Sequence, residues 1–316
     1  MPIFSTHPSQ QSYPSGLFPS VVTGGGSLPD FITANKPAID AGLAQSGAVL
    51  FRGFNVPDAH ALDDAIQAYG EHGFSYADSL SNAVRVNITP RVFTANEAPP
   101  DVSIFLHHEM AQTPLYPAKL FFYCEIAPGE GGATPLCRSD ILYERLMETA
   151  PETAAKFERE GVRYTNVMPP APDPDSGQGR SWRDTLGAAD KPAAEKRLSD
   201  LGYSFEWLPV DVLKATTPVL DAVRLLPDGR KVFFNQLIAA FRGWKDARND
   251  PSKSVTFGDG SPIDLAVMQD AIQIADDLSY DLNWQAGDVA LLDNFIVMHG
   301  RRPYKGKRRV LASLIG

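Results

Sequence analysis

Cysteines are scarce in this chain of 316 residues: it has two, Cys124 and Cys137, and they do not form a C-x-x-C motif. Two cysteines are too few for a disulfide framework, so we expect reduced thiols and a cytoplasmic protein. Long apolar runs are also absent, since no stretch approaches the roughly 20 apolar residues of a membrane span. The N-terminus lacks the basic and apolar segments of a signal peptide. The sequence therefore predicts no membrane partner.

Positive charge is in deficit as well. The chain has 29 Lys and Arg against 38 Asp and Glu, which gives a formal net charge of -9. A nucleic-acid-binding protein needs clustered cations that neutralise phosphates, so this balance argues against such a partner. The basic segment HGRRPYKGKRR at 299–309 is a local exception. It therefore needs an explanation of its own.

The two ends of the chain have strand patterns and the middle has helical patterns. Apolar strand-like segments occur at 47–54, 118–128, 281–285, 287–294 and 308–316. Helical spacing occurs at 58–73, 138–150, 151–161 and 261–278. A parallel α/β fold would alternate strands and helices regularly, and this chain does not. The order favours a mainly β fold, an antiparallel barrel or jelly roll with a helical insertion.

Two of the expected helices have recognisable start signals. Asp58 is placed as an N-cap for the first of them. In the last, Ser261 is placed as the cap and Pro262 lies in the first turn. The sequence therefore predicts that this last helix begins directly after Ser261.

We expect a single domain over residues 1–316. Its first 30 residues are rich in Ser, Pro and Gly and are predicted to form an irregular arm. Residues from about 138 to 280 form the predicted insertion with its helices. Within it, 167–180 has too much Pro, Gly and Asp for regular structure, and a loop of that length is often functional. A lid over the site and an inert surface loop are both compatible with this composition.

The chain has six histidines, and two of them are adjacent in IFLHHEM at 104–110. A His-x-Glu triplet is weak by itself, because chance can supply one and both histidines could be packed or solvated. On a strand, however, residues i and i+2 share a face, so His107 and Glu109 would point together while His108 points away. Two such donors with one remote histidine make a 2-His-1-carboxylate iron site. A zinc protease motif fails, because H-E-x-x-H would need histidine at Gln112.

His299 is the candidate for the remote histidine, in the segment GDVALLDNFIVMHGRRPYKGKRRVL at 287–311. Arg308 and Arg309 follow it by about ten residues. An arginine can grip a carboxylate through two parallel hydrogen bonds, as a dicarboxylate cosubstrate would require. The alternative is that both arginines lie on a solvated basic strand. Because adjacent residues of a strand face opposite sides, we expect only one of the two to bind a cosubstrate.

The sequence resembles the TauD/TfdA family of Fe(II)/2-oxoglutarate-dependent dioxygenases, and within it the SyrP-like branch. The resemblance covers roughly residues 45–316 and is carried by five motifs. They are GAVLFRGF, FLHHEMAQTPLYPAKLFFYCEIAPGEGGATPL, VFFNQL, FGDGSPID and GDVALLDNFIVMHGRRPYKGKRRVL. The branch usually has Asn where this chain has His108, and only that position of the His-x-Glu-Met motif departs. The resemblance implies a double-stranded β-helix, the cupin-like form of the jelly roll.

Residue by residue, the resemblance implies that His107, Glu109 and His299 hold Fe(II). It implies that Thr134, together with Arg308 or Arg309, binds 2-oxoglutarate, with O2 as the second cosubstrate. Arg308 aligns with the nearer branch and Arg309 with taurine dioxygenase, and we favour Arg308.

The resemblance further implies hydroxylation of an amino acid or amino-acid-derived metabolite, free or presented on a carrier protein. The position that serves the sulfonate in taurine dioxygenase falls on Ala312 or Ser313 here, which disfavours a sulfonate. Asn235, Gln236 and His108 are candidate substrate contacts, although the first two could instead satisfy buried backbone groups. Desaturation, cyclisation and a non-catalytic jelly-roll binding protein are the alternatives. The oligomeric state is not predicted.

Overall fold

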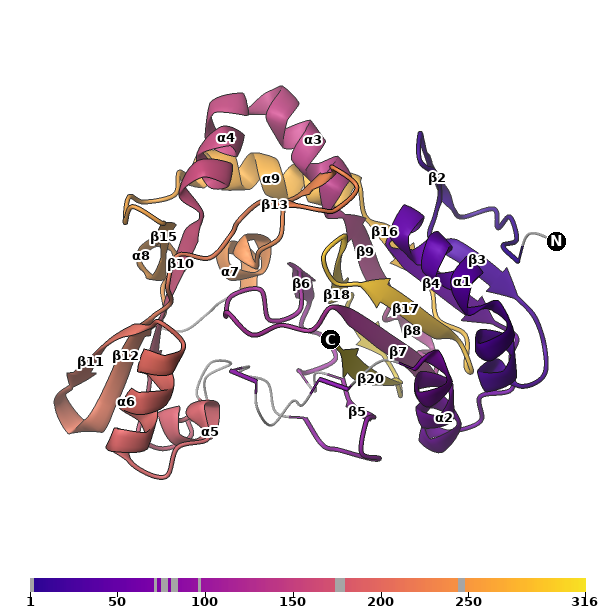
Figure 1. Cartoon of the computed structure of the whole chain (residues 1–316), viewed down its shortest axis with the longest axis horizontal. Coiled ribbons are helices and arrows are strands. Elements are labelled where there is room, and N and C mark those ends of the chain that lie inside the picture. Colours follow the sequence, from indigo (N-terminus) through magenta and orange to yellow (C-terminus); the bar gives the residue numbers. More distant parts are fainter. Residues whose placement is uncertain are drawn as a thin grey trace.

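The computed structural model describes residues 3–70, 73–74, 79–80, 85–95, 98–173, 180–243 and 248–316. Two sheets form the centre of the molecule (Figure 1). The larger has the order β3 (Ser20–Thr23), β4 (Ala48–Arg52), β17 (Val289–Asp293), β7 (Lys119–Ile126), β20 (Arg309–Ile315) and β5 (Phe93–Thr94). The smaller has the order β16 (Tyr280–Leu282), β9 (Thr134–Arg138), β18 (Val297–Arg301) and β6 (Ile104–His107). All their pairings are antiparallel except that of β3 with β4.

The sheets pack face to face because their strands alternate between two apolar surfaces. In β7, Phe122 and Cys124 point toward the smaller sheet, where they join a core that includes Leu136. Phe121 and Tyr123 point the other way, toward the helices that cover the larger sheet. Both faces are therefore buried, and the strands between 118 and 128 and near the C-terminus were read correctly from the sequence.

Helices cover the outer face of each sheet (Figure 1). On the larger sheet lie α1 (Leu28–Ser46) and α2 (Ala59–Tyr69). On the smaller sheet lie α3 (Ser139–Thr149), α4 (Pro151–Glu160), α7 (Leu237–Gly243) and α9 (Leu265–Asp277). The predicted cap of α2 is confirmed, since the Asp58 carboxylate accepts from the backbone N–H groups of His60 and Ala61, each at 2.9 Å. Of the helices described, none is both long and apolar enough to cross a membrane.

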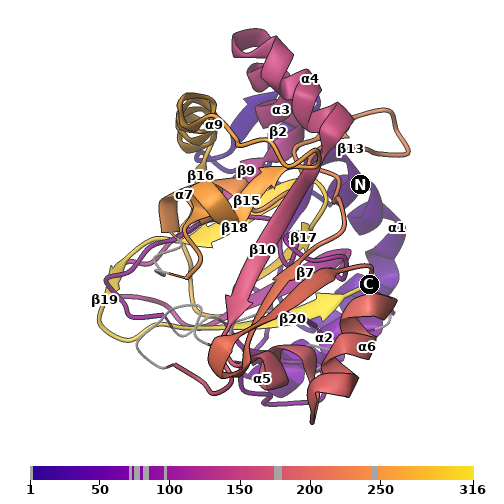
Figure 2. The same cartoon turned by 90° about the vertical axis from the view of Figure 1, so that its left-hand side faces the viewer.

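The residues between β9 and β16 form the segment predicted as an insertion. Besides α3, α4, α7 and α9, this segment contains a further four-stranded sheet, which β10 (Val162–Met168) connects to the helices above it (Figure 2). Its other strands are β11 (Ser204–Leu208), β12 (Val212–Thr216) and β15 (Val255–Phe257). Helices α5 (Trp182–Leu186) and α6 (Lys191–Asp200) pack on β12 through a separate apolar cluster that includes Trp182 and Leu213.

Shorter elements complete the chain. They are β1 (Gln11–Tyr13), β2 (Gly16–Phe18), β8 (Glu130–Gly131), a 3-10 turn (Pro209–Asp211), β13 (Arg224–Leu225), β14 (Lys231–Val232), α8 (Pro251–Ser254) and β19 (Tyr304–Lys305).

The prediction of an irregular arm over residues 1–30 is wrong for residues 11–23. β1 and β2 form a hairpin that turns at Pro14 and Ser15, and Gly16 directly after the turn has a φ of 127°, which favours glycine. β3 then joins the larger sheet parallel to β4, with Ser20 opposite Val49. The reason is tertiary, because the edge of β4 supplies the partner that this Ser- and Pro-rich segment cannot supply locally.

The predicted start of the last helix is also wrong. α9 begins at Leu265, and its N-cap is Asp264, whose carboxylate accepts from the N–H of Ala266 at 2.8 Å. Ser261 lies instead in a turn after β15, where its carbonyl accepts from the N–H of Phe257. Ser and Pro serve both turns and helix starts, so the local pattern was ambiguous.

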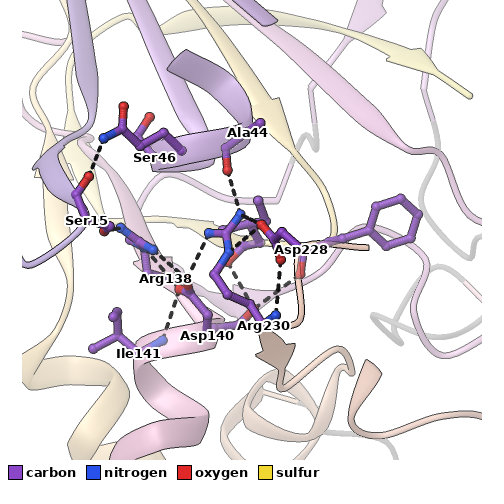
Figure 3. Close-up of polar contacts among 12 residues, drawn as sticks. Ser15, Ala44, Ser46, Arg138, Asp140, Ile141, Asp228 and Arg230 are labelled. Atoms are coloured by element: carbon purple, nitrogen blue, oxygen red, sulfur yellow. Dashed lines mark hydrogen bonds and ion pairs between the residues drawn. The ribbon is translucent and has the colours of Figure 1, made fainter. Parts of the chain in front are cut away.

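An ion-pair network fastens the N-terminal hairpin to the core (Figure 3). Arg138, at the end of β9, has 2% of its surface exposed and pairs with Asp140. It also donates to the Ser15 hydroxyl at 2.6 Å, and Arg230 reaches the same Asp140 carboxylate at 3.1 Å. The network therefore connects three segments that are distant in the sequence.

Candidate metal centre

Two histidines face each other on adjacent strands of the smaller sheet. His107 ends β6 and His299 lies in the middle of β18, and the register places them directly opposite. Their ring centroids are 4.4 Å apart. The apolar neighbours of both histidines fix the orientation of the two strands, because Leu106 and Met298 point outward into the helical layer. Alternation then turns both imidazoles inward, toward the larger sheet.

Glu109 completes the group. Its Oε2 lies 3.4 Å from Nε2 of His299 and 3.9 Å from Nε2 of His107, and the three ligand atoms lie within 4.8 Å of one another. Strand alternation predicts this convergence, but for the wrong reason, because β6 ends at His107. Glu109 lies in the turn that follows, where Met110 has a φ of 59°. The turn, not a strand face, directs the carboxylate back toward the histidines.

His108 points away from this group. It is fully buried, its Nδ1 lies within hydrogen-bond distance of the Asn294 carbonyl, and its ring packs on Phe234 at 4.8 Å between centroids. Burial lowers the pKa of its imidazole to about 3, so the ring is neutral. The structure therefore does not bring His108 together with His107, Glu109 and His299.

Asn294 holds the turn that carries Glu109. Its Oδ1 accepts from the N–H of Glu109 at 2.8 Å, and its Nδ2 donates to the carbonyls of Glu109 at 3.0 Å and Pro117 at 2.8 Å. Asn294 is fully buried, between β17 and β18. One amide side chain thus satisfies both backbone groups of the acidic residue.

His107 has the protonation state that a metal requires. Burial, with the His299 ring beside it, lowers the pKa of His107 to about 4. The Nδ1 of His107 lies 2.8 Å from the Phe105 carbonyl, which can accept only if Nδ1 carries the proton. The Nε2 lone pair then faces Glu109, as in metal sites whose outer hydrogen bond fixes the tautomer.

Arg85 contacts the carboxylate of Glu109 from the other side. Its Nη2 donates to Oε1 at 3.0 Å, and both side chains are almost fully buried. Burial alone would raise the pKa of Glu109, but Arg85 and the two imidazoles outweigh it and hold that pKa well below its usual range. Glu109 is therefore ionised. Two imidazole nitrogens and one carboxylate oxygen form a donor set that fits Fe(II).

A threonine on the inner face of the smaller sheet contacts a partly buried arginine, Arg308, which directly precedes β20 of the larger sheet. Thr134 is two residues before Leu136, which lies opposite His299. The Thr134 hydroxyl oxygen accepts from Nε1 of Trp284 at 2.9 Å and from Nη2 of Arg308 at 3.4 Å. Arg308 also donates to the Gly132 carbonyl at 2.9 Å. Because the Thr134 oxygen accepts twice, its own proton can point to a ligand.

Arg308 and Arg309 have different surroundings. Burial and the nearby Arg301 lower the pKa of Arg308 to about 10, and no carboxylate of the described residues lies within 4.0 Å of its nitrogens. Arg309 extends to the opposite side of β20, where it pairs with Glu125 at 2.7 Å and its side chain is 48% exposed. The strand thus separates the two arginines, as alternation requires.

Asn235 and Gln236 serve backbone groups. Asn235 is fully buried, donates to the Ala222 carbonyl at 3.2 Å and accepts from the N–H of Leu237 at 3.0 Å. Gln236 donates to the carbonyl of His108 at 3.0 Å. These bonds match the structural alternative that the sequence left open.

Three neighbours of the site have no counterpart in the sequence predictions: Arg85, Asn294 and Trp284. The position of Asn294 just before the apolar segment of His299 is a weak signal, and the other two have none. Of the possible lid at 167–180, residues 174–179 lie outside the described part of the chain.

Comparison with known proteins agrees with this site. Residues 11–314 match the family model described as "Taurine catabolism dioxygenase TauD, TfdA family". A clavaminate synthase-like protein of Arabidopsis thaliana is 43% identical over 97% of this chain and 96% of its own length. The dapdiamide synthesis protein DdaC of Enterobacter agglomerans is 26% identical over 99% of this chain and 94% of its own.

Solved structures share the fold. A taurine dioxygenase from Burkholderia xenovorans superposes with a TM-score of 0.54 at 18% identity, covering 98% of this chain and 90% of that one. AAD-2 in complex with Mn(II) and N-oxalylglycine gives 0.53 at 15% identity, covering 97% and 96%. The predicted jelly-roll core is thereby confirmed, whereas the assignment to the SyrP-like branch stays a prediction. The chain belongs to the TauD/TfdA family of Fe(II)- and 2-oxoglutarate-dependent dioxygenases.

Proposed function

We propose that this enzyme hydroxylates an amino acid or amino-acid-derived metabolite, free or bound to a carrier protein, and that it acts in the cytoplasm. The observation that carries the proposal is the convergence of His107, Glu109 and His299 between the two sheets, with Thr134 on the inner face of the smaller sheet and Arg308 bonded to it. Desaturation and cyclisation would use the same groups, and product analysis separates them.

His107 and His299 through Nε2, and Glu109 through Oε2, would hold Fe(II). When bound, Fe(II) with 2-oxoglutarate and O2 supplies the oxidising chemistry, in which the cosubstrate is decarboxylated to succinate. The protein contributes fixed donors: the Phe105 carbonyl orients His107, and Asn294 holds the backbone of Glu109. Such outer bonds keep ligands in place before the metal arrives.

Arg308 is the proposed partner of the distal carboxylate of 2-oxoglutarate. Its guanidinium is mostly buried beside the Thr134 hydroxyl and has no ion-pair partner among the described residues. A buried cation without an anion is costly, so binding a dicarboxylate relieves that cost. Arg309 already has Glu125, and we assign it no cosubstrate role.

The substrate is proposed to be a small molecule. The relatives named for clavaminate synthase and for dapdiamide synthesis support this class. Ala312, at a position where a sulfonate-binding arginine would be expected, is fully buried in β20. That burial supports a substrate other than a sulfonate. His108, Asn235 and Gln236 are proposed to shape the site through backbone contacts and not to touch the substrate.

Anaerobic titration tests the cosubstrate assignment. Addition of Fe(II) and then 2-oxoglutarate should give a visible charge-transfer band, and His107→Ala should abolish it. The matched control is His108→Ala, because the two residues are adjacent but only His107 faces Glu109. Folded His108→Ala protein should keep the band, and loss of the band there alone would overturn the assignment of donors.

A second experiment tests the substrate class. Succinate release from 2-oxoglutarate should rise when free or carrier-bound amino acids are supplied, and mass analysis of the product should show one added oxygen atom. A product that has lost two hydrogens would replace hydroxylation by desaturation or cyclisation. Stimulation by alkyl sulfonates alone would refute the amino-acid proposal.

A further inference from the structure

The carboxylate of Glu109 is divided between two sets of partners. Its Oε1 accepts from Nη2 of Arg85 at 3.0 Å, whereas its Oε2 faces Nε2 of His299 at 3.4 Å. The two oxygens therefore point in different directions, one toward a cation and the other toward the imidazoles. Nothing in the family resemblance or in the sequence patterns drew attention to Arg85.

Arg85 is held firmly in this position. Its side chain is 7% exposed, and its guanidinium carbon lies 5.2 Å from the ring centroid of Phe93. Phe93 belongs to β5, which pairs with β20 at the edge of the larger sheet, opposite Ala312. An aromatic ring attracts a cation placed over it, and this attraction stabilises the guanidinium in a buried site. Arg85 thus reaches Glu109 from the segment that precedes β5, with its guanidinium against Phe93.

A carboxylate can bind a metal through one oxygen or through both. In a 2-His-1-carboxylate site the difference matters, because the carboxylate must take one position so that three remain open. A bond from arginine to Oε1 is charge-assisted and short, so it competes directly with the metal for that oxygen.

We propose that Arg85 is a positioning residue that occupies Oε1 of Glu109 and so restricts this carboxylate to one-oxygen binding. Its role is to keep free the position that a second carboxylate oxygen would take. The inference rests on the proposed function, since the open positions matter only if 2-oxoglutarate and O2 use them. Its direct readout, however, is the binding mode of Glu109 toward a metal alone.

The test uses Mn(II) as the probe, without turnover. Full-length protein is labelled with carboxyl-13C glutamate, and infrared difference spectra are recorded with and without Mn(II). One-oxygen binding gives a wide separation of the two carboxylate stretching bands, and two-oxygen binding gives a narrower one. The variants are Arg85→Met, Arg85→Lys and Arg91→Met. Arg91 is the control because it lies in the same segment but pairs with Asp63 on α2.

We expect the wide separation in wild type and Arg91→Met and a narrow one in Arg85→Met. In the same proteins loaded with Mn(II), Arg85→Met should weaken 2-oxoglutarate binding by about tenfold, the lower range for loss of an outer-shell partner. Arg85→Lys retains a cation and one donor, so it should restore the wide separation and part of the affinity. If Arg85→Met does not fold, the lysine variant still decides through these two readouts.

The proposal would be overturned if Arg85→Met had the same band separation and the same affinity for 2-oxoglutarate as wild type. A narrow separation in Arg85→Lys together with wild-type affinity would also overturn it. If Arg85→Met narrows the band separation relative to wild type but neither protein binds 2-oxoglutarate, the proposed function fails while the positioning of Glu109 by Arg85 stands. The two failures are therefore distinguishable.

Discussion

Among the buried carboxylates that pair with arginine, Asp140 and Glu109 differ in what remains unsatisfied. Asp140 accepts through Oδ1 from Nε of Arg138 and the N–H of Ile141, and through Oδ2 from Arg138 and Arg230 (Figure 3). Both of its oxygens are thus taken. Glu109 gives one oxygen to an arginine and turns the other toward two imidazole nitrogens. We call a buried carboxylate closed when protein donors occupy both of its oxygens, and its role is then structural. We call it open when one oxygen stays available, and it is then a candidate metal ligand.

His299→Ala should have the largest effect on the open carboxylate, Glu109. The substitution removes the nitrogen 3.4 Å from Oε2 of Glu109, so two donors are left where three converged. We expect the charge-transfer band with Fe(II) and 2-oxoglutarate to disappear and turnover to fall to background. Anaerobic absorption spectroscopy and succinate release measure this. A wild-type band would contradict the convergence of the three donors.

Asp140→Asn tests the closed carboxylate, Asp140. This change leaves the guanidinium groups of Arg138 and Arg230 without their shared anion, which should lower the free energy of unfolding by about 3–5 kcal/mol. Urea unfolding of the metal-free protein measures the loss. Folded Asp140→Asn protein should still form the charge-transfer band. Stability equal to wild type would show that the closed network does not support the fold.

A matched pair of arginines sharpens the same contrast between open and closed partners. Arg308→Met should weaken 2-oxoglutarate binding by roughly 100-fold, since a charge-assisted pair contributes up to about 3 kcal/mol. The side chain of Arg309 is half exposed and already pairs with Glu125. Arg309→Met should therefore change the affinity for 2-oxoglutarate by less than about twofold. Titration of the Fe(II)-loaded proteins decides. Equal losses would mean that the two sides of β20 are not functionally distinct.

Asn294→Ala has the smallest expected effect. It leaves both backbone groups of Glu109 without the amide that satisfies them, at a cost of about 1–3 kcal/mol. We expect a lower melting temperature and weaker Mn(II) binding, because the turn that presents Glu109 loosens. The control is Asn283→Ala, whose exposed amide contacts only the Asp281 carbonyl among the bonds recorded for it. Unchanged Mn(II) affinity in Asn294→Ala would remove Asn294 from the positioning of Glu109.

Much of the fold was predictable, because strands buried on both faces leave continuous apolar segments. β4, β7, β17 and β20 all follow from such segments. The N-terminal strand β3 does not, because it has only four residues, its partner is β4, and the segment around it is rich in Ser and Pro. The start of α9 was misplaced for a related reason, since Ser261 and Pro262 fit a turn as well as a helix start.

The sequence by itself determined the chemistry available: two histidines and a glutamate in the motifs of a dioxygenase family, and a pair of arginines beyond them. Those are properties of residue type and spacing along one strand or turn. Only the tertiary structure decided that His299 meets Glu109, that Arg308 contacts Thr134, and that Arg85 reaches the second carboxylate oxygen. The physical reason is that these contacts join segments far apart in the chain, where no periodic pattern records the partner.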